Sequence, residues 1–183
     1  YAMITKYFVI FGSLILLGVI VFADVLKFLL LHDKSYWEAM KVVPLIILAN
    51  FFLGIYNNLS VWYKLTDRTK MGAYISIVGA VLTLVLNYLL IPKFSYYGSA
   101  IATIAAYGSM MFISYVMGNK YYPIPYDMEK IGGYLGLSIV FSAISFYGFR
   151  ENYFVGIPLL LLFMYFVYHN EKATIQTIIK RKK

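Results

Sequence analysis

Long apolar stretches alternate with short polar breaks along the whole chain. These stretches approach the roughly 17 to 25 residues with which a helix crosses a bilayer. Backbone groups inside lipid have no water to bind, so the pattern predicts helices rather than open strands. We therefore expect an all-α integral membrane bundle of six spanning helices. The predicted spans are Tyr7–Leu31, Val42–Tyr63, Met71–Ile91, Tyr97–Gly118, Ile131–Phe149 and Tyr153–Tyr168.

The connection between the third and fourth predicted spans is placed at Pro92–Ser95. Proline breaks the hydrogen-bond pattern of a helix interior, and Lys93 is costly in mid-membrane but tolerated at the surface. Tyr96 and Tyr97 fit the aromatic belt of the membrane interface. The pattern predicts a tight surface turn here. Similar belts are predicted at Tyr36-Trp37, Trp62-Tyr63, Tyr121-Tyr122 and Tyr153.

Composition supports the membrane assignment. Hydrophobic residues make up 62% of the 183 residues and charged residues 13%, against about 25% charged in a typical soluble domain. Cysteine is absent, which excludes disulfides, thiol nucleophiles and thiolate metal sites. The net charge of +8 does not indicate a nucleic-acid partner, because the cations lie in the connections between spans, where membrane topology explains them.

The distribution of Lys and Arg predicts the orientation. If the six spans alternate in direction, 11 of the 16 cations fall on the side of the N-terminus, and the positive-inside rule makes that side cytoplasmic. The terminal "KRKK" contributes four of them. We expect both chain ends to be cytoplasmic, in a multi-pass protein of the inner membrane. The cations on the other side are Lys27, Lys34, Lys41, Lys93 and Arg150.

The polar breaks divide the chain unevenly. Residues 1–118 hold four predicted spans, 119–130 form a Pro-rich cytoplasmic loop ("NKYYPIPYDMEK"), and 131–170 hold two further spans. Residues 171–183 form a basic tail that is either a short surface helix, with an apolar face and a basic end, or disordered. The chain begins with Tyr1 rather than Met, so we expect that an N-terminal part is missing.

Small residues line one face of the third and fourth spans. They allow membrane helices to approach closely, and their hydroxyls bond across the contact. The pattern predicts helix packing; the alternative is a smooth surface that slides during a conformational change. The residues are Gly72, Ser76, Gly79, Thr83, Gly98 and Ala102.

The second span carries amides, which inside a membrane face the bundle interior or a wet cavity. Asn50, Gly54 and Asn57 share one face, with Asn58 adjacent and Pro44 as a plausible bend. Two interpretations stay open: hydrogen bonding between helices, or a polar cavity that binds a sugar-like ligand.

Charged residues flank the same region. Asp24 and Lys27 are spaced to pair at the end of the first span, either as a membrane-boundary pair or as a charged element at the mouth of a transport pathway. Lys41 precedes the second span and could join them to attract an anion.

Catalytic patterns are not evident in the sequence. The two histidines, His32 and His169, lie at predicted helix ends and have no metal-ligand spacing. The eight acidic residues are interpreted as scattered in loops, without a pair suited to acid–base work. We therefore expect a protein that is not an enzyme and that uses no cofactor.

Three stretches resemble the C-terminal half of polysaccharide flippases, the Wzx-type O-antigen and capsule exporters of the multidrug/oligosaccharidyl-lipid/polysaccharide superfamily. They are "YWEAMKVVPLI" (Tyr36–Ile46), "TDRTK" (Thr66–Lys70) and "LNYLLIPKFSYYGSAIAT" (Leu86–Thr103). The last is the most specific, because it is similar to the family's Leu-Asn…Ile-Pro…Gly-x-Ala-x-Ala-Thr pattern.

The resemblance implies a two-lobed alternating-access carrier. The first four spans would complete the second lobe, with the missing N-terminal lobe as its partner, and the last two would be an appended pair. The implied cargo is a polyprenyl-diphosphate-linked oligosaccharide moved across the cytoplasmic membrane, with membrane lipid around it. Amides would contact sugars, cations the diphosphate, and an apolar groove the lipid tail. The alternatives are a multidrug or peptidoglycan-precursor exporter of the same superfamily, a membrane enzyme of polysaccharide assembly, and a non-catalytic scaffold.

Overall fold

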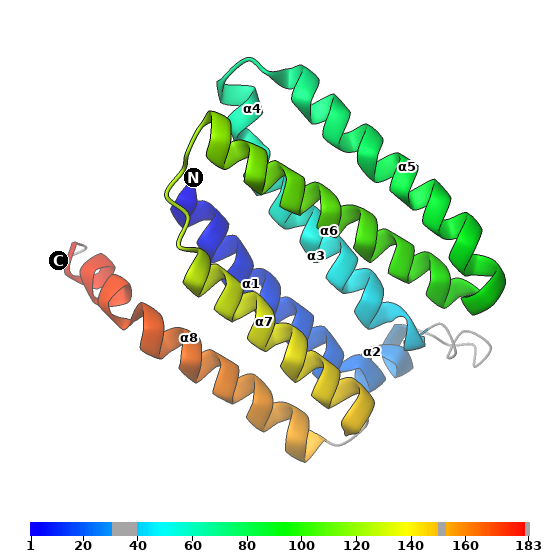
Figure 1. Cartoon of the computed structure of the whole chain (residues 1–183). Coiled ribbons are helices and arrows are strands. Elements are labelled where there is room, and N and C mark those ends of the chain that lie inside the picture. The colour runs from blue at the N-terminus through cyan, green and yellow to red at the C-terminus, as the bar shows by residue number, and fades with distance from the viewer. Residues whose placement is uncertain (31–39, 150–152, 182–183) are drawn as a thin grey trace.

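The computed structural model describes residues 1–30, 40–149 and 153–181, with side chains for 1–28, 40–149 and 153–172. This part of the chain is almost entirely helical and contains no strand (Figure 1). Six helical segments within it are long and apolar enough to cross a membrane. The predicted all-α membrane bundle of six spans is therefore confirmed.

The helices follow one another with short connections. The first three spans are α1 (Ala2–Val21) with the short α2 (Ala23–Leu30), α3 (Val43–Leu59) with the short α4 (Val61–Leu65), and α5 (Thr69–Phe94). The last three are α6 (Tyr96–Tyr121), α7 (Met128–Ala143) with one π-helical turn η2 (Ile144–Gly148), and α8 (Tyr153–Arg181).

Neighbouring helices form a slab with α5 at one edge and α8 at the other (Figure 1). From α5 the contacts run through α6 and α3 to α1, and α7 and α8 pack on α1. The N-terminus, the α4–α5 turn and the α6–α7 connection lie at one end of the slab, called the N-terminal end below (Figure 1). The α5–α6 turn and α2 lie at the opposite end. This alternation places the two chain ends on the same side.

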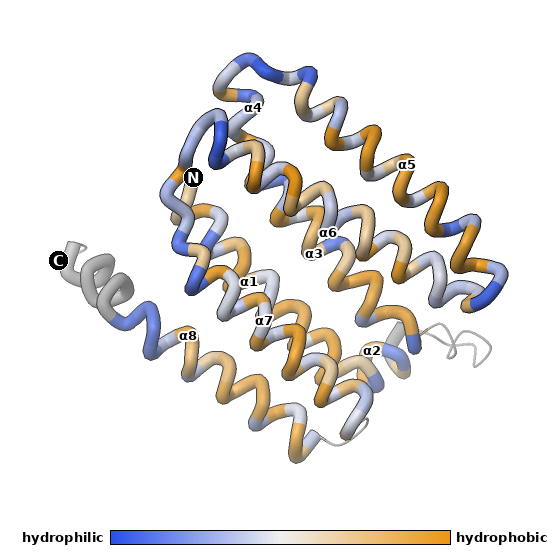
Figure 2. Tube along the Cα trace, in the orientation of Figure 1, coloured by the Kyte–Doolittle hydropathy of each residue, from blue (hydrophilic) through white to orange (hydrophobic). Residues whose placement is uncertain are grey.

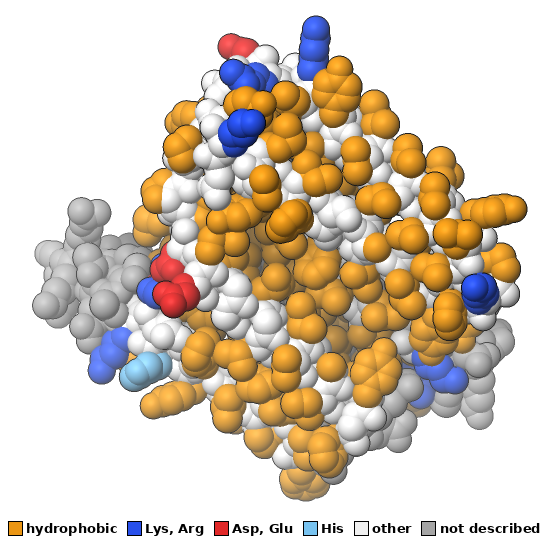
Figure 3. All heavy atoms as spheres, viewed as in Figure 1, with side chains coloured by type: hydrophobic (Ala, Val, Ile, Leu, Met, Phe, Trp, Pro, Cys, Tyr) orange, Lys and Arg blue, Asp and Glu red, His pale blue; other side chains and the backbone are white. Residues whose placement is uncertain are grey.

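Hydrophobic residues occupy most of the length of the helices, and many of the hydrophilic residues lie towards the two ends of the bundle (Figure 2). The face seen in Figure 3 is largely apolar, and the charged side chains lie around its rim. Apolar residues on the outside of a helix bundle are expected where lipid replaces water as the solvent. The structure is therefore that of a multi-pass membrane protein.

The interior has two apolar clusters. The larger surrounds α1 and includes Leu17, Tyr134 and Phe163, each fully buried. The second joins α3, α4, α5 and α6 around Trp62 and Tyr63. These two aromatic residues are 1% and 9% exposed, so the predicted aromatic belt at Trp62-Tyr63 is wrong: the rings fill the core at the end of the bundle. The belt predicted at Tyr36-Trp37 lies outside the described residues.

The predicted turn at Pro92–Ser95 is only partly right. Helix α5 continues through Pro92 and Lys93 to Phe94, and α6 begins at Tyr96, so Ser95 alone joins the two helices. Pro92 stands in the last turn of α5, where its missing N–H removes one backbone hydrogen bond, and only two helical residues follow it. Ser95 has φ 52° and ψ −134°, a conformation that usually requires glycine.

Two other local predictions are corrected. The first span does not run unbroken from Tyr7: α1 ends at Val21, and α2 begins after a break at Phe22. Pro44 does not bend α3, because it occupies the first turn of that helix, where the missing N–H has no partner to lose. Hydropathy does not detect either feature, since apolar residues continue through both.

Helix α8 runs without interruption to Arg181. The backbone of the expected tail from residue 171 to 181 is thus helical and continues the last span instead of forming a separate helix. Whether this end lies on the membrane surface stays a prediction.

Candidate functional site

Two amides are presented on the outside of the second span. Asn50 and Asn57 are both exposed, and seven residues of α-helix place them two turns, about 10 Å, apart on one face. The Asn50 amide nitrogen donates to the Ile46 carbonyl of its own helix at 2.9 Å, which leaves its oxygen available as an acceptor. The adjacent Asn58 is half-buried and donates to the Gly54 carbonyl at 3.0 Å.

Beside this face, α1 packs closely against α3. The Phe51 ring lies against Gly12 of α1, and the Phe8 ring lies against Gly54 of α3, so close that a Cβ at either glycine would collide with the ring. A shallow hollow of about 260 Å³ lies beside this crossing, and Asn50 contributes a polar side chain to its otherwise apolar lining. We call this region the α1/α3 hollow. An amide beside an open apolar hollow offers hydrogen bonds to a ligand that enters it.

The charged candidates lie at the end of the bundle opposite the N-terminal end. The Asp24 carboxylate and the Lys27 ammonium group of α2 are 3.7 Å apart and mostly buried, so the predicted ion pair is present. Lys41 is exposed just before α3. Asn57 lies about 20 Å further along the same helix, counted at 1.5 Å per residue. The structure therefore does not gather the six predicted cavity residues into one compact pocket.

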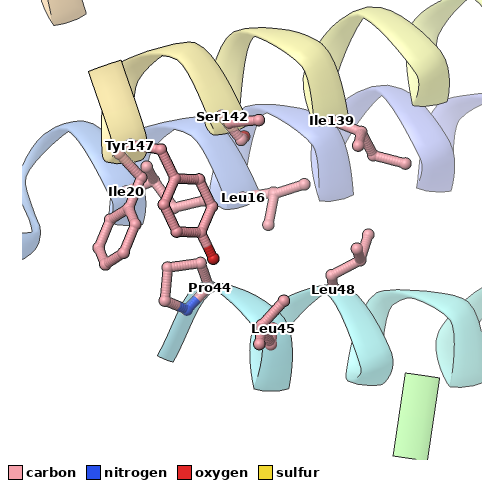
Figure 4. A pocket seen from close by; sticks show the side chains of 10 residues that line it. Leu16, Ile20, Pro44, Leu45, Leu48, Ile139, Ser142 and Tyr147 are labelled. Carbon is pink, nitrogen blue, oxygen red and sulfur yellow. The ribbon is translucent and has the colours of Figure 1, made fainter. Parts of the chain in front are cut away.

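An apolar cavity separates α7 from α3. Its volume is about 110 Å³, and Figure 4 shows side chains of α1, α3, α7 and η2 pointing into it. A second apolar cavity of about 120 Å³ lies between α7 and the helices α3 and α6, nearer the N-terminal end. We call the region lined by these two cavities the α7 seam. Its lining, with almost no polar surface, fits hydrocarbon and not sugar.

The small residues of α5 and α6 divide into two groups. Gly72, Gly79, Gly98 and Ala102 are buried. A Cβ at Gly79 would collide with the Met110 sulfur, and one at Gly98 would lie 2.5 Å from the Leu90 carbonyl oxygen. Ser76 is exposed, and the half-buried Thr83 bonds to the Gly79 carbonyl of its own helix at 2.8 Å.

A buried ion cluster was missed by the sequence analysis. The Glu171 side chain of α8 is 3% exposed, and its carboxylate lies 2.7 Å from the Lys6 ammonium group of α1 and 3.6 Å from that of Lys130. The Tyr134 hydroxyl of α7 donates to the same carboxylate at 3.1 Å. The expectation that all acidic residues lie in loops is therefore wrong. The one signal in the sequence was an isolated Glu at the polar end of an apolar span.

This cluster connects the last two spans to α1 at the N-terminal end. Asp127 caps the first turn of α7 by accepting from the Lys130 backbone N–H at 3.2 Å, and its carboxylate lies 3.7 Å from the Lys130 ammonium group. In the adjacent connection, burial raises the pKa of the Tyr126 phenol above its ordinary value. The arrangement is electrically balanced, with two carboxylates for two ammonium groups.

The comparisons with known proteins give one match. Residues 1–89, from α1 into α5, match the model of the MatE family, which is part of the MOP exporter superfamily. Members of this family are transporters rather than enzymes, and the match indicates a membrane transporter. No curated protein and no solved structure matches the chain.

Proposed function

We propose that the chain is part of a carrier that moves a polyprenyl-diphosphate-linked oligosaccharide across the cytoplasmic membrane by alternating access, for O-antigen, capsule or exopolysaccharide export. The match of residues 1–89 to an exporter family supports transport. The observation that carries the choice of cargo is the pair of exposed amides in mid-span, Asn50 and Asn57. Polar groups inside a membrane segment are costly against lipid, and sugar hydroxyls would satisfy both their donors and their acceptors.

The division of the surface supports the same cargo. The α1/α3 hollow combines an amide with aromatic and aliphatic side chains, while the α7 seam is lined almost entirely by apolar side chains. A lipid-linked oligosaccharide has both kinds of surface. A carrier works through differential binding in two states, so translocation by this route needs no covalent chemistry. We assign the sugar to the hollow and the lipid tail to the seam.

The test uses the full protein in cells that depend on it for polysaccharide export. Asn50→Leu and Asn57→Leu should both reduce export, because each removes the hydrogen bonds offered to the sugar while the protein still inserts. The lipid-linked repeat unit should then accumulate on the cytoplasmic side. Asn58→Leu is the matched control, since that amide is half-buried and does not share the exposed face of Asn50 and Asn57.

Normal export in both variants would contradict the assignment of the hollow. Failure to synthesise the repeat unit would place the protein before translocation and contradict the proposed function. Loss of drug resistance with normal export would instead assign the carrier to multidrug transport.

A further inference from the structure

An aromatic stack holds two cations together at the N-terminal end. The Tyr121 ring, at the end of α6, stacks on the Trp62 indole of α4 with ring centroids 5.7 Å apart and an interplanar angle of 16°. The Arg68 guanidinium carbon lies 4.3 Å from the centroid of the Tyr121 ring, and the Lys120 ammonium nitrogen lies 5.8 Å from it. Both distances are within the range of cation–π attraction. Two positive charges therefore share one ring.

The platform under these cations is rigid. The Trp62 indole N–H donates to the Ser114 hydroxyl at 3.3 Å, and the side chain is 1% exposed. Gly118 of α6 permits this approach, because a Cβ there would lie 2.9 Å from the indole ring. The ring positions are thus set by buried contacts, while Arg68 and Lys120 themselves are exposed. Such preorganisation lowers the entropy lost when a ligand is bound.

The charge at this position is not balanced by the surrounding protein. Within residues 61–70 and 114–122 there are four cations and one acidic residue, Asp67. The described structure shows no ion pair within 4.0 Å between Asp67 and Arg68 or Lys120. Figure 3 shows several Lys and Arg side chains near the α4–α5 turn above an apolar face. Like charges on one ring repel each other, so an anion placed between them would be attracted by both. The cations of this group are Lys64, Arg68, Lys70 and Lys120.

We propose that Arg68 and Lys120, held on Tyr121, bind the phosphate of an anionic phospholipid headgroup in the leaflet at the N-terminal end. Guanidinium and ammonium groups are the side-chain groups that most commonly donate hydrogen bonds to phosphate in proteins. The apolar helices below the cations present a surface along which acyl chains lie, so the site meets the lipid where headgroup and hydrocarbon join. The positive-inside prediction places this end in the cytoplasmic leaflet, whose anionic lipids attract basic segments beside a membrane span. This site is independent of the cargo proposed above.

The test measures lipid binding to the purified protein in neutral detergent. Phosphatidylglycerol is titrated against phosphatidylcholine, and retained lipid is counted by native mass spectrometry. Removing one cation should weaken binding of the anionic lipid about five-fold, so Arg68→Gln with Lys120→Gln should weaken it about 25-fold. The matched control is Lys64→Gln with Lys70→Gln, which removes the same charge at the same end without touching Tyr121. Tyr121→Leu, which removes the platform, should weaken binding about as much as Arg68→Gln.

Three results would overturn the proposal. An equal loss in the control pair would show diffuse attraction to the basic end. Equal retention of both lipids by the unmodified protein would show that charge is not recognised. Inorganic pyrophosphate that displaces phosphatidylglycerol at equal concentration would assign the cations to a free diphosphate.

Discussion

Replacing Glu171 should loosen the attachment of α8 to the rest of the bundle. The carboxylate is 3% exposed and lies 2.7 Å from the Lys6 ammonium group, which is itself only 12% exposed. Removing one partner of a buried ion pair leaves an uncompensated buried charge and costs about 3–5 kcal/mol. Glu171→Leu also leaves the Tyr134 hydroxyl without its acceptor, a further loss of about 1–3 kcal/mol when the site cannot relax.

The contribution of Lys130 to the same carboxylate is smaller. Its ammonium group is 3.6 Å away and the side chain is 38% exposed, so solvent screening limits this pair to about 0–1 kcal/mol. Glu171→Gln retains an oxygen acceptor for Tyr134 and should therefore cost less than Glu171→Leu. The expected order of destabilisation is Glu171→Leu, then Glu171→Gln, then Lys130→Met.

The assay is the free energy of unfolding in mixed micelles, measured for each variant and for Lys6→Met combined with Glu171→Leu. Because the double variant removes both buried charges, it should recover much of the stability that either single change loses. Strictly additive losses would show that the two groups do not interact. A loss below about 1 kcal/mol for Glu171→Leu would show that the cluster behaves as a solvated surface pair.

Two further predictions concern the α5–α6 turn. Ser95→Gly should raise the free energy of unfolding by about 1 kcal/mol, since Ser95 has φ 52°. Ser95→Ala should give no gain. Equal effects of the two changes on the free energy of unfolding would contradict a strained backbone at Ser95. Single cysteines at Ser95 and Thr66, introduced into this cysteine-free chain, should react with an impermeant thiol reagent from opposite sides of the membrane, with Thr66 on the cytoplasmic side. Labelling of both from one side would refute the topology.

The six spans could be predicted because the bilayer imposes a strong constraint: each helix must be apolar over nearly its whole length. The limits of the four middle spans follow from the same rule to within three residues, whereas α1 begins at Ala2 and α8 continues to Arg181. Pro92 illustrates where the rule is insufficient. A proline was taken to end the helix, but α5 continues two residues beyond it, and the actual turn at Ser95 depends on a backbone conformation that composition does not reveal.

Contacts between distant parts of the chain were beyond the sequence. Trp62 was interpreted as an interfacial residue because its place next to a polar turn is typical of one, yet Gly118 of another helix makes room to bury it. Glu171 was assigned to a polar tail. Its partner Lys6 is 165 positions away, so the sequence did not show that the two residues pair. The amides could be placed on one face of α3 from their spacing alone, but their exposure depends on how α1 crosses that helix.

The separation of Lys6 from Glu171 also has a consequence for biosynthesis. The two residues are 165 positions apart, which corresponds to roughly 10–30 s of translation. During this time α1 is already in the membrane with an unpaired ammonium group, and α7 and α8, which cover it in the finished bundle, have not been made. Until α8 is made, α1 therefore carries a cation whose buried partner is still missing, and the ion pair closes only when this helix reaches α1.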